Sequence, residues 1–280
     1  MPKFSLIVLS KTDQQSTYDM NVECFDTFIK SAIKAKVDYE ILLIESNKNS
    51  HYQYNVQHLK IITPKDAFSF HKFLNIGVSH ANAEYYILSN NDVVFDINWL
   101  VETNNVLQHN PKLLSVSPLD PKANSLPKEA LENNNYIVGY QIQKHLTGWC
   151  IVAHKKVFEA IKKLDERFGF YYADNDYAMQ LQKYNIKHAL VTNAIVHHLH
   201  GQSSVGDNKN KSFELPAKTP NYIIKENWTW VLNNKKMIEG LILFHDKWGS
   251  RKTIKIKLFL ANTVSKLGLG YLNRFIITHS

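Results

Sequence analysis

FSLIVL at residues 4–9 and EILLI at residues 40–44 are apolar runs with the length of a β-strand. Because apolar residues fill nearly every position of these runs, the runs predict strands that are buried on both faces of a sheet. The segment between them predicts a helix, since apolar residues recur there at helical spacing. These residues are Val22, Phe25, Phe28, Ile29 and Ile33.

The alternation of strand and helix continues further along the chain. Leu59–Ile62 predicts a strand that ends before Pro64, Lys72–His80 predicts a short helix, and Tyr85–Leu88 predicts the next strand. This order of elements is typical of a doubly wound α/β sheet flanked by helices. Ligands of such sheets bind at the carboxyl ends of the strands, so we expect the functional residues there.

The composition limits the class of protein. The chain has 280 residues, of which 44% are hydrophobic and 21% charged, and this excludes disordered and collagen-like proteins. Cys24 and Cys150 have apolar neighbours, which predicts buried free thiols in a reducing compartment. The apolar stretch at the N-terminus is too short for a signal peptide, and no run approaches the roughly 20 apolar residues of a membrane-spanning helix. We therefore expect a soluble, cytoplasmic protein.

The sequence contains no glycine-rich phosphate-binding loop of the GxGxxG or Walker type. This argues against a nicotinamide-dependent dehydrogenase and against a P-loop ATPase or kinase. A nucleotide that binds to this protein therefore needs other groups to hold its phosphates.

Basic residues are concentrated at the C-terminal end. The formal net charge is +8, and residues 247–280 contain no Asp or Glu, so the chain before them is nearly neutral. This asymmetry is typical of contact with a polyanion or an anionic membrane surface, or else of a solvated basic helix. The basic residues are Lys247, Arg251, Lys252, Lys255, Lys257, Lys266 and Arg274.

The same C-terminal segment predicts a helix that packs on the body of the protein. Its apolar residues recur at spacings of a helical stripe, and we expect the stripe to face inward and the bases outward. The stripe residues are Leu260, Val264, Leu267, Tyr271 and Phe275.

Three segments contain residues suited to chemistry. The strand Tyr85–Leu88 leads into Asn90, Asn91 and Asp92, and a carboxylate at that position can hold Mg²⁺ or Mn²⁺, although such a run can also be only a turn. Asp174 begins a helix on its inward face, where it can serve as a general base or only as an N-cap.

On the same helix, Asp176 is expected on a more polar side. The third segment follows the expected strand His188–Val191 and contains His197, His198 and His200. These residues are suited to metal binding, or they are only a polar strand end.

In order and spacing, these segments resemble the family 2 glycosyltransferases with a GT-A fold, over about residues 4 to 205. Leu9-Ser10 and Glu45-Ser46-Asn47 are similar to the turns that read the nucleobase in that family, and Asn75-Ile76-Gly77 is similar to its Asn-x-Gly element. Asn90-Asn91-Asp92 resembles its metal motif, and Ala173-Asp174-Asn175-Asp176 resembles its catalytic motif. The other similar segments are Gly148-Trp149-Cys150, Leu164–Phe168, His198–Ser203 and Lys247-Trp248-Gly249.

The resemblance implies an α/β fold of the GT-A type, with a Rossmann-like mixed central sheet flanked by helices and a C-terminal helical extension. It implies a GT-A domain over residues 1–205 and an extension with a basic amphipathic tail over residues 206–280. The implied activity is inverting, metal-dependent transfer of a sugar from a nucleotide-diphosphate donor, a UDP-sugar in particular.

The resemblance also implies a role for individual residues. Asp174 is the catalytic base, and Asp92 and His198 hold Mn²⁺ or Mg²⁺; Asn in place of the first acid of the motif leaves one carboxylate. The residues implied in donor binding are Ser10, Glu45, Asn47, Asn75 and Asn91. The residues implied in acceptor binding or support are Trp149, Asp176 and His200.

The acceptor is not determined by the sequence. Most members of the family build glycans, but Tyr171–Ala178 also resembles bacteriophage-encoded members, which implies a hydroxymethylated base of DNA as the alternative acceptor. The expected location is the cytoplasm. Within it, the protein is expected either free or at the periphery of a membrane, and a phage protein would lie in the host cytoplasm. The alternative function is a non-catalytic GT-A-like module that binds a glycan or a polyanion.

Overall fold

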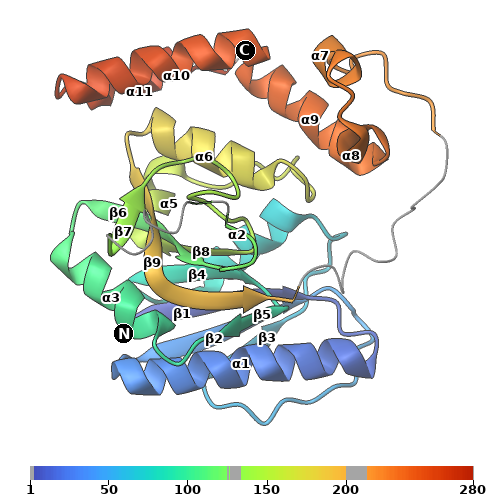
Figure 1. The fold of residues 1–280 in the computed structure, drawn as a ribbon. Coiled ribbons are helices and arrows are strands. Elements are labelled where there is room, and N and C mark those ends of the chain that lie inside the picture. Colours follow the sequence, from blue (N-terminus) through green and yellow to red (C-terminus); the bar gives the residue numbers. More distant parts are fainter. Residues whose placement is uncertain (1–2, 125, 127–133, 200–212, 280) are drawn as a thin grey trace.

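The computed structural model describes residues 3–124, 126, 134–199 and 213–279 as a mixed sheet with helices on both faces (Figure 1). Its strands are β1 (Phe4–Ser10), β2 (Tyr39–Glu45), β3 (Leu59–Ile62), β4 (Tyr85–Asn90), β5 (Val93–Phe95), β6 (Leu113–Leu119), β7 (Tyr136–Val138), β8 (Cys150–His154) and β9 (Lys187–His198). Its helices are α1 (Gln15–Ala35), α2 (Phe70–His80), α3 (Trp99–His109), α5 (Lys155–Ile161), α6 (Ala173–Lys183), α7 (Asn221–Lys225), α8 (Thr229–Leu232), α9 (Lys235–Trp248), α10 (Arg251–Lys266), η1 (Gly270–Leu272) and α11 (Asn273–Ile276).

The strand order of the sheet is β3-β2-β1-β4-β8-β6-β9-β5, and β7 pairs with β9. The strands β3, β2, β1 and β4 are parallel neighbours, whereas β8 runs antiparallel to both β4 and β6. This confirms the predicted mixed central sheet flanked by helices. Because β1 lies between β2 and β4, Ser10 pairs with Glu45, and Leu9 pairs with Asn90, so three predicted segments meet at one edge.

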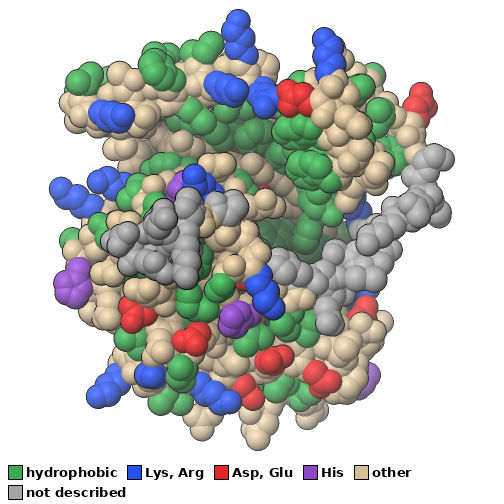
Figure 2. Space-filling model, in the orientation of Figure 1, with side chains coloured by type: hydrophobic (Ala, Val, Ile, Leu, Met, Phe, Trp, Pro, Cys, Tyr) green, Lys and Arg blue, Asp and Glu red, His purple; other side chains and the backbone are tan. Residues whose placement is uncertain are grey.

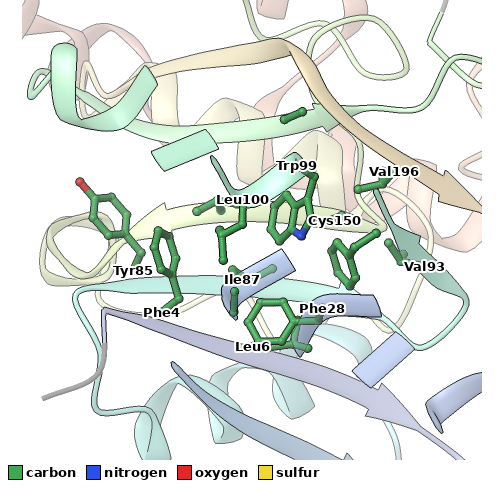
Figure 3. Close-up of a cluster of buried hydrophobic side chains, with 14 of the residues drawn as sticks. Phe4, Leu6, Phe28, Tyr85, Ile87, Val93, Trp99, Leu100, Cys150 and Val196 are labelled. Atoms are coloured by element: carbon green, nitrogen blue, oxygen red, sulfur yellow. The ribbon is translucent and has the colours of Figure 1, made fainter. Parts of the chain in front are cut away.

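The first strands are buried on both faces because their side chains alternate between two cores. Phe4, Leu6 and Val8 of β1 join the core with α1 and α3, while Ile7 and Leu9 join the core with α2, α5 and α6. Figure 3 shows the first of these cores, in which the Trp99 and Phe28 rings of α3 and α1 pack over the sheet. The burial on both faces that the apolar runs predicted is thus confirmed.

The predicted helix between β1 and β2 is confirmed as α1, but its core face differs from the predicted one. Phe25 and Phe28 are buried as expected, whereas Ile33 is 67% exposed. The inward face instead includes Met20, Asn21 and Cys24. Cys24 and Cys150 are free and buried as predicted, and burial raises the pKa of both thiols.

The C-terminal helices pack on the outer side of α6 (Figure 1). Phe168 and Met179 of the body form a core with Phe244, Trp248 and Ile277 from the extension. The predicted boundary between residues 205 and 206 lies outside the described residues. In the described part of the chain, no helix combines the length and the apolar content that crossing a membrane requires.

The predicted inward stripe of the C-terminal helix is wrong. Leu267, Tyr271 and Phe275 are 71%, 60% and 65% exposed. One helix cannot carry the whole stripe, because α10 ends at Lys266 and Gly268 adopts a left-handed conformation with φ of 79°. The residues that do pack against the body are Ile254, Leu258, Ala261, Ile276 and Ile277.

Gly77 of α2 lies against the sheet without a side chain between them. A Cβ atom at this position would lie 2.3 Å from Ile7 Cγ2 and 3.4 Å from Ile44 Cγ1. We predict that Gly77→Ala lowers the free energy of unfolding by about 1–3 kcal/mol, because the added methyl group overpacks the core. Urea denaturation measures this change. Gly169→Ala is the control, since its Cβ would have no atom within 4 Å, and an equal loss in both variants would contradict the prediction.

Candidate active site at the carboxyl edge of the sheet

The ends of β1 and β2 carry a network of buried polar side chains. The Glu45 carboxylate accepts hydrogen bonds from the backbone N–H of Thr12 at 3.0 Å, from the backbone N–H of Asn47 at 2.7 Å, and from the Thr12 hydroxyl. The Asn47 amide donates to the Thr12 carbonyl at 2.7 Å, and Ser10 Oγ lies 3.2 Å from Thr12 Oγ1. The predicted donor-binding residues Ser10, Glu45 and Asn47 therefore lie together. Both Glu45 oxygens accept bonds from the protein, so this side chain shapes the two turns, and its contact with a nucleobase stays a prediction.

Two further residues of this network were not predicted from the sequence. Asn21 Nδ2 donates to Thr12 Oγ1 at 2.9 Å and to the Tyr54 hydroxyl at 2.7 Å. Asn21 Oδ1 accepts a hydrogen bond of 2.9 Å from Asn91 Nδ2, which connects β4 to the same network. The signal for Asn21 was an amide on the inward face of α1, between Met20 and Cys24.

Stacked rings fix the loop after β2 on α1. The ring centroids of His51 and Tyr52 lie 4.6 Å apart, those of Tyr52 and Tyr18 5.0 Å apart, and those of Tyr18 and Tyr54 4.9 Å apart. Tyr54 also bonds to Asn21, so the stack connects this loop to the polar network. The turn at the end of β2 is thereby held on two sides.

Asp92 and His198 form a second part of the site. Asp92 is buried just after β4, and its Oδ1 lies 3.2 Å from Nε2 of His198. The strand expected at His188–Val191 is longer than predicted and reaches His198, which pairs with Val93 of β5. The His198 ring stacks on Trp149, with centroids 5.1 Å apart and 12° between the planes. The fold thus brings together residues from three separate predicted segments.

Asp120 belongs to the same region and was not predicted. It follows directly after β6 and is buried. Its Oδ2 accepts a hydrogen bond of 3.1 Å from the backbone N–H of His198, and its Oδ1 accepts one of 2.8 Å from that of Lys122. The sequence signal was the same as for Asp92, a carboxylate at the end of a strand of the central sheet.

Asp92 and His198 fit a divalent cation that also binds a phosphate group. Asp92 Oδ1 is buried and accepts no hydrogen bond from the described residues, and Nε2 of His198 lies 3.2 Å from it. The described residues contain no group of three or more His, Cys, Asp or Glu that could hold a metal alone. Mg²⁺ needs only one or two protein ligands when substrate phosphates supply other oxygens. The pair therefore suits a cation that arrives with a diphosphate.

Asp174 lies in the first turn of α6. The alternative prediction that it is only an N-cap is wrong, because Tyr172 occupies that position. Asp174 Oδ1 accepts a hydrogen bond of 2.9 Å from the backbone N–H of Asn175, and the carboxylate borders a small cavity with His71. Burial raises the pKa of Asp174 above its ordinary value. A partly buried carboxylate with a raised pKa is suited to act as a general base.

His71 is a neighbour of Asp174 that was not predicted. It is buried on α2, its Nδ1 lies 3.0 Å from the Asp165 carbonyl, and burial lowers its pKa to about 4. The ring is therefore neutral at physiological pH. It adds no positive charge beside Asp174, so it does not oppose the raised pKa of that carboxylate.

Gly148 and Trp149 connect the two chemical groups of the site. A Cβ atom on Gly148 would lie 3.0 Å from Asp174 Cβ and 3.2 Å from its Oδ2, so a larger residue would require Asp174 to shift by a few tenths of an ångström. The next residue, Trp149, stacks on His198, the neighbour of Asp92. Figure 2 shows the surface hollowed near the end of β9, below the C-terminal helices, with hydrophobic side chains in its walls.

The prediction that Asp176 lies on a polar side of its helix is wrong, because Asp176 is fully buried. Its Oδ1 lies 2.7 Å from Lys247 Nζ and accepts a hydrogen bond of 2.8 Å from Trp248 Nε1. Lys247 Nζ also lies 2.9 Å from Asp165 Oδ2. The helical pattern of α6 could not reveal this, because the partners come from α9, far along the chain.

The pKa values in this cluster follow from burial and charge. Burial raises the pKa of Asp176, although Lys247 and Trp248 act in the opposite direction. Burial would also raise the pKa of Asp165, but Arg167 and Lys247 together hold it well below its usual range. Asp165 is therefore the charged partner of Lys247 at every physiological pH.

Asn75, a predicted donor-binding residue, has partners outside the polar network. The Asn75 amide holds the loop before α6: its Nδ2 donates to the Leu164 carbonyl at 2.9 Å, and its Oδ1 accepts from the Leu164 N–H at 2.9 Å. Asn75 therefore supports the segment that leads to Asp174, and its role in donor binding stays a prediction. His200 lies outside the described residues.

No protein-family model and no curated protein matches the sequence. Among solved structures, the chain is similar to GalNAc-T7, solved with UDP, GalNAc and Mn²⁺, with a TM-score of 0.64 and 10% identity over 100% of this chain and 56% of that chain. It is also similar to residues 1–349 of TarS from S. aureus, with a TM-score of 0.54 and 12% identity over 97% of this chain and 80% of that chain. The chain has the GT-A fold.

At identities this low, these similarities concern the GT-A fold, and this chain spans about half the length of the GalNAc-T7 chain. The resemblance to family 2 and to bacteriophage-encoded members stays a prediction. In this GT-A chain, the polar network, the Asp92–His198 pair and Asp174 all lie around the carboxyl ends of β1, β2 and β4.

The buried Lys247 is expected to contribute to the stability of the protein. We predict that Lys247→Met lowers the free energy of unfolding by about 3–5 kcal/mol, because it leaves the buried Asp176 carboxylate without its cation, whereas Asp165 keeps Arg167. Lys218→Met is the matched control, since its ion pair with Asp246 is exposed and should contribute less than about 1 kcal/mol. Chemical denaturation of both variants measures the difference. Equal stability of the two variants would show that the buried cluster contributes little.

Proposed function

We propose that this protein transfers a sugar, with inversion, from a UDP-sugar to an acceptor hydroxyl with the help of Mg²⁺ or Mn²⁺. The observation that carries the proposal is the arrangement around Gly148 and Trp149. Gly148 contacts Asp174, the candidate base, and Trp149 stacks on His198, which lies 3.2 Å from Asp92. The GT-A fold supports the proposal, since GalNAc-T7, a protein of similar fold, was solved with UDP, GalNAc and Mn²⁺.

The donor would lie along the carboxyl edge of the sheet. The turns that Glu45 fixes at Thr12 and Asn47 would receive the nucleoside, which agrees with the position of Ser10 in the same network. Asp92 and His198 would hold the cation, which when bound supplies positive charge against the diphosphate leaving group. Because the protein offers one carboxylate in this pair, the diphosphate would provide much of the cation's ligand set.

Asp174 would accept the proton in the transfer step. Its carboxylate takes the proton of the acceptor hydroxyl while that oxygen forms a bond to the anomeric carbon. The bond from the anomeric carbon to the diphosphate breaks on the opposite face, and the diphosphate leaves with the electron pair. The configuration of the sugar is therefore inverted, and the proton ends on Asp174. A positioned general base contributes about 10²–10⁴-fold to such a step.

The first prediction of this mechanism concerns Asp174. We predict that Asp174→Asn lowers the rate of transfer at least about a hundredfold and leaves UDP-sugar affinity nearly unchanged, since the variant loses only the base. In the wild type, the rate should fall as the pH falls through the raised pKa of Asp174, because the base must be ionised.

Asp26→Asn, an exposed change on α1, is the control for the Asp174 variant. Initial rates over a range of pH, with calorimetric affinities for UDP, measure both effects. Near wild-type transfer by the Asp174 variant would remove this residue from the mechanism.

The second prediction concerns the cation. We predict that EDTA abolishes transfer, that Mg²⁺ or Mn²⁺ restores it, and that Asp92→Ala weakens UDP binding only when the cation is present. Calorimetry of UDP with and without Mn²⁺ measures the second effect independently of activity. Full activity in excess EDTA would mean that Asp92 only shapes the turn after β4.

Donor hydrolysis without acceptor is the measurement that separates an enzyme from a binding module. A panel of UDP-sugars should reveal slow hydrolysis of one donor, and that donor can then be tested with defined glycans and with hydroxymethylated DNA. Binding of a glycan or polyanion without hydrolysis or transfer of any donor would favour the non-catalytic module instead.

A further inference from the structure

The outer side of α10 and of the segment after it combines apolar and basic side chains. Ile254, Leu258 and Ala261 turn toward the body, and the residues on the opposite side of α10 face solvent. Figure 2 shows basic and hydrophobic side chains together along the edge formed by this helix. The exposed apolar residues of the surface are Ile256, Phe259, Leu260, Leu267, Leu269, Tyr271 and Phe275.

The basic residues of the C-terminal segment fall into two groups. Lys247 is buried, Arg251 pairs with Glu226 at 2.6 Å, and Lys257 donates to the Trp248 and Thr278 carbonyls. The other four bases are exposed beside the apolar residues, and residues 247–280 contain no Asp or Glu. These four bases are Lys252, Lys255, Lys266 and Arg274.

We propose that this surface binds an anionic lipid bilayer. In an amphipathic helix at a membrane surface, apolar side chains enter the boundary of headgroups and acyl chains while bases contact lipid phosphates. The α10 surface has both groups on one side, with Phe259 70% exposed and with Lys252 and Lys255 beside it. An exposed apolar surface of this kind also marks an interaction site in general, and its charge selects the partner.

Charge favours a bilayer over the other occupants of this surface. A second copy docked through the same surface would bring Lys252, Lys255 and Lys266 close to their own equivalents, and like charges oppose such contact. A nucleic acid would match the bases but would leave the Phe259 and Leu267 side chains without an apolar partner. A bilayer with anionic headgroups matches both kinds of side chain.

Vesicle flotation with the full-length chain tests this inference without any assay of sugar transfer. We expect binding to vesicles of phosphatidylcholine with about 30% phosphatidylglycerol, weak binding to phosphatidylcholine alone, and loss of binding as the salt concentration rises. Lys252→Gln/Lys255→Gln/Lys266→Gln should weaken binding to anionic vesicles at least about tenfold. Phe259→Ser/Leu267→Ser should weaken binding at low salt too, because the apolar contribution is lost.

Matched variants elsewhere on the molecule control for charge and exposure. Lys30→Gln/Lys34→Gln/Lys112→Gln removes the same charge from exposed positions, and Ile33→Ser removes an exposed apolar side chain from α1. Both should bind vesicles like the wild type, and circular dichroism should show all variants folded.

Three results would overturn the inference. The first is wild-type protein that does not float with anionic vesicles at low salt. The second is equal loss of binding in the control variants. The third is a surface used for another partner: tighter binding to duplex DNA than to vesicles, or a dimer in light scattering that Phe259→Ser/Leu267→Ser dissociates. A failure of sugar transfer would leave the result of flotation unchanged.

Discussion

The buried ion pairs of Lys247 with Asp165 and Asp176 join the C-terminal extension to the helix that carries Asp174. Removing these charges from water is costly, so the arrangement is stable only with all partners present and well placed. The Trp248 indole donates to the same Asp176 oxygen that contacts Lys247, which limits how α9 can lie on α6. The position of Asp174, two residues before Asp176, therefore depends on a segment far away in the sequence.

The site is built from elements that hold each other at the carboxyl edge of the sheet. Asn75 of α2 clamps the loop that leads to α6, and Gly148 allows that helix to approach the segment before β8. On the other side, the Glu45 and Asn21 bonds fix the turns after β1 and β2. Rigid support of this kind would matter for the proposed transfer, because small errors in the position of a base or a leaving group cost much of the rate.

The C-terminal end of α9 and the outer side of α10 lie in different chemical environments. The end of α9 carries the buried cation Lys247, while the outer side of α10 exposes Phe259 among bases. Net charge alone does not distinguish the buried or paired bases of the C-terminal segment from its exposed ones.

Local sequence pattern was enough to predict several parts of the fold. The apolar runs of β1 and β2 predicted strands buried on both faces, and the order of elements predicted a doubly wound α/β sheet, because both signals are local. The mixed character of the sheet was implied by the resemblance to GT-A glycosyltransferases. The sequence also indicated Asp92, His198 and Asp174, through their positions at the ends of strands and at the start of a helix.

Other features depend on contacts between segments that are far apart in the chain. Asp176 is buried and not on the polar side expected for it, because its cation Lys247 comes from α9. Asp120 belongs to the site because its partner is the backbone of β9. Leu267 and Phe275 are exposed because the helix expected to carry them inward ends near Gly268. Helical periodicity describes one element at a time, whereas the partner of a buried charge and the direction of a helical face are set by which elements the fold brings together.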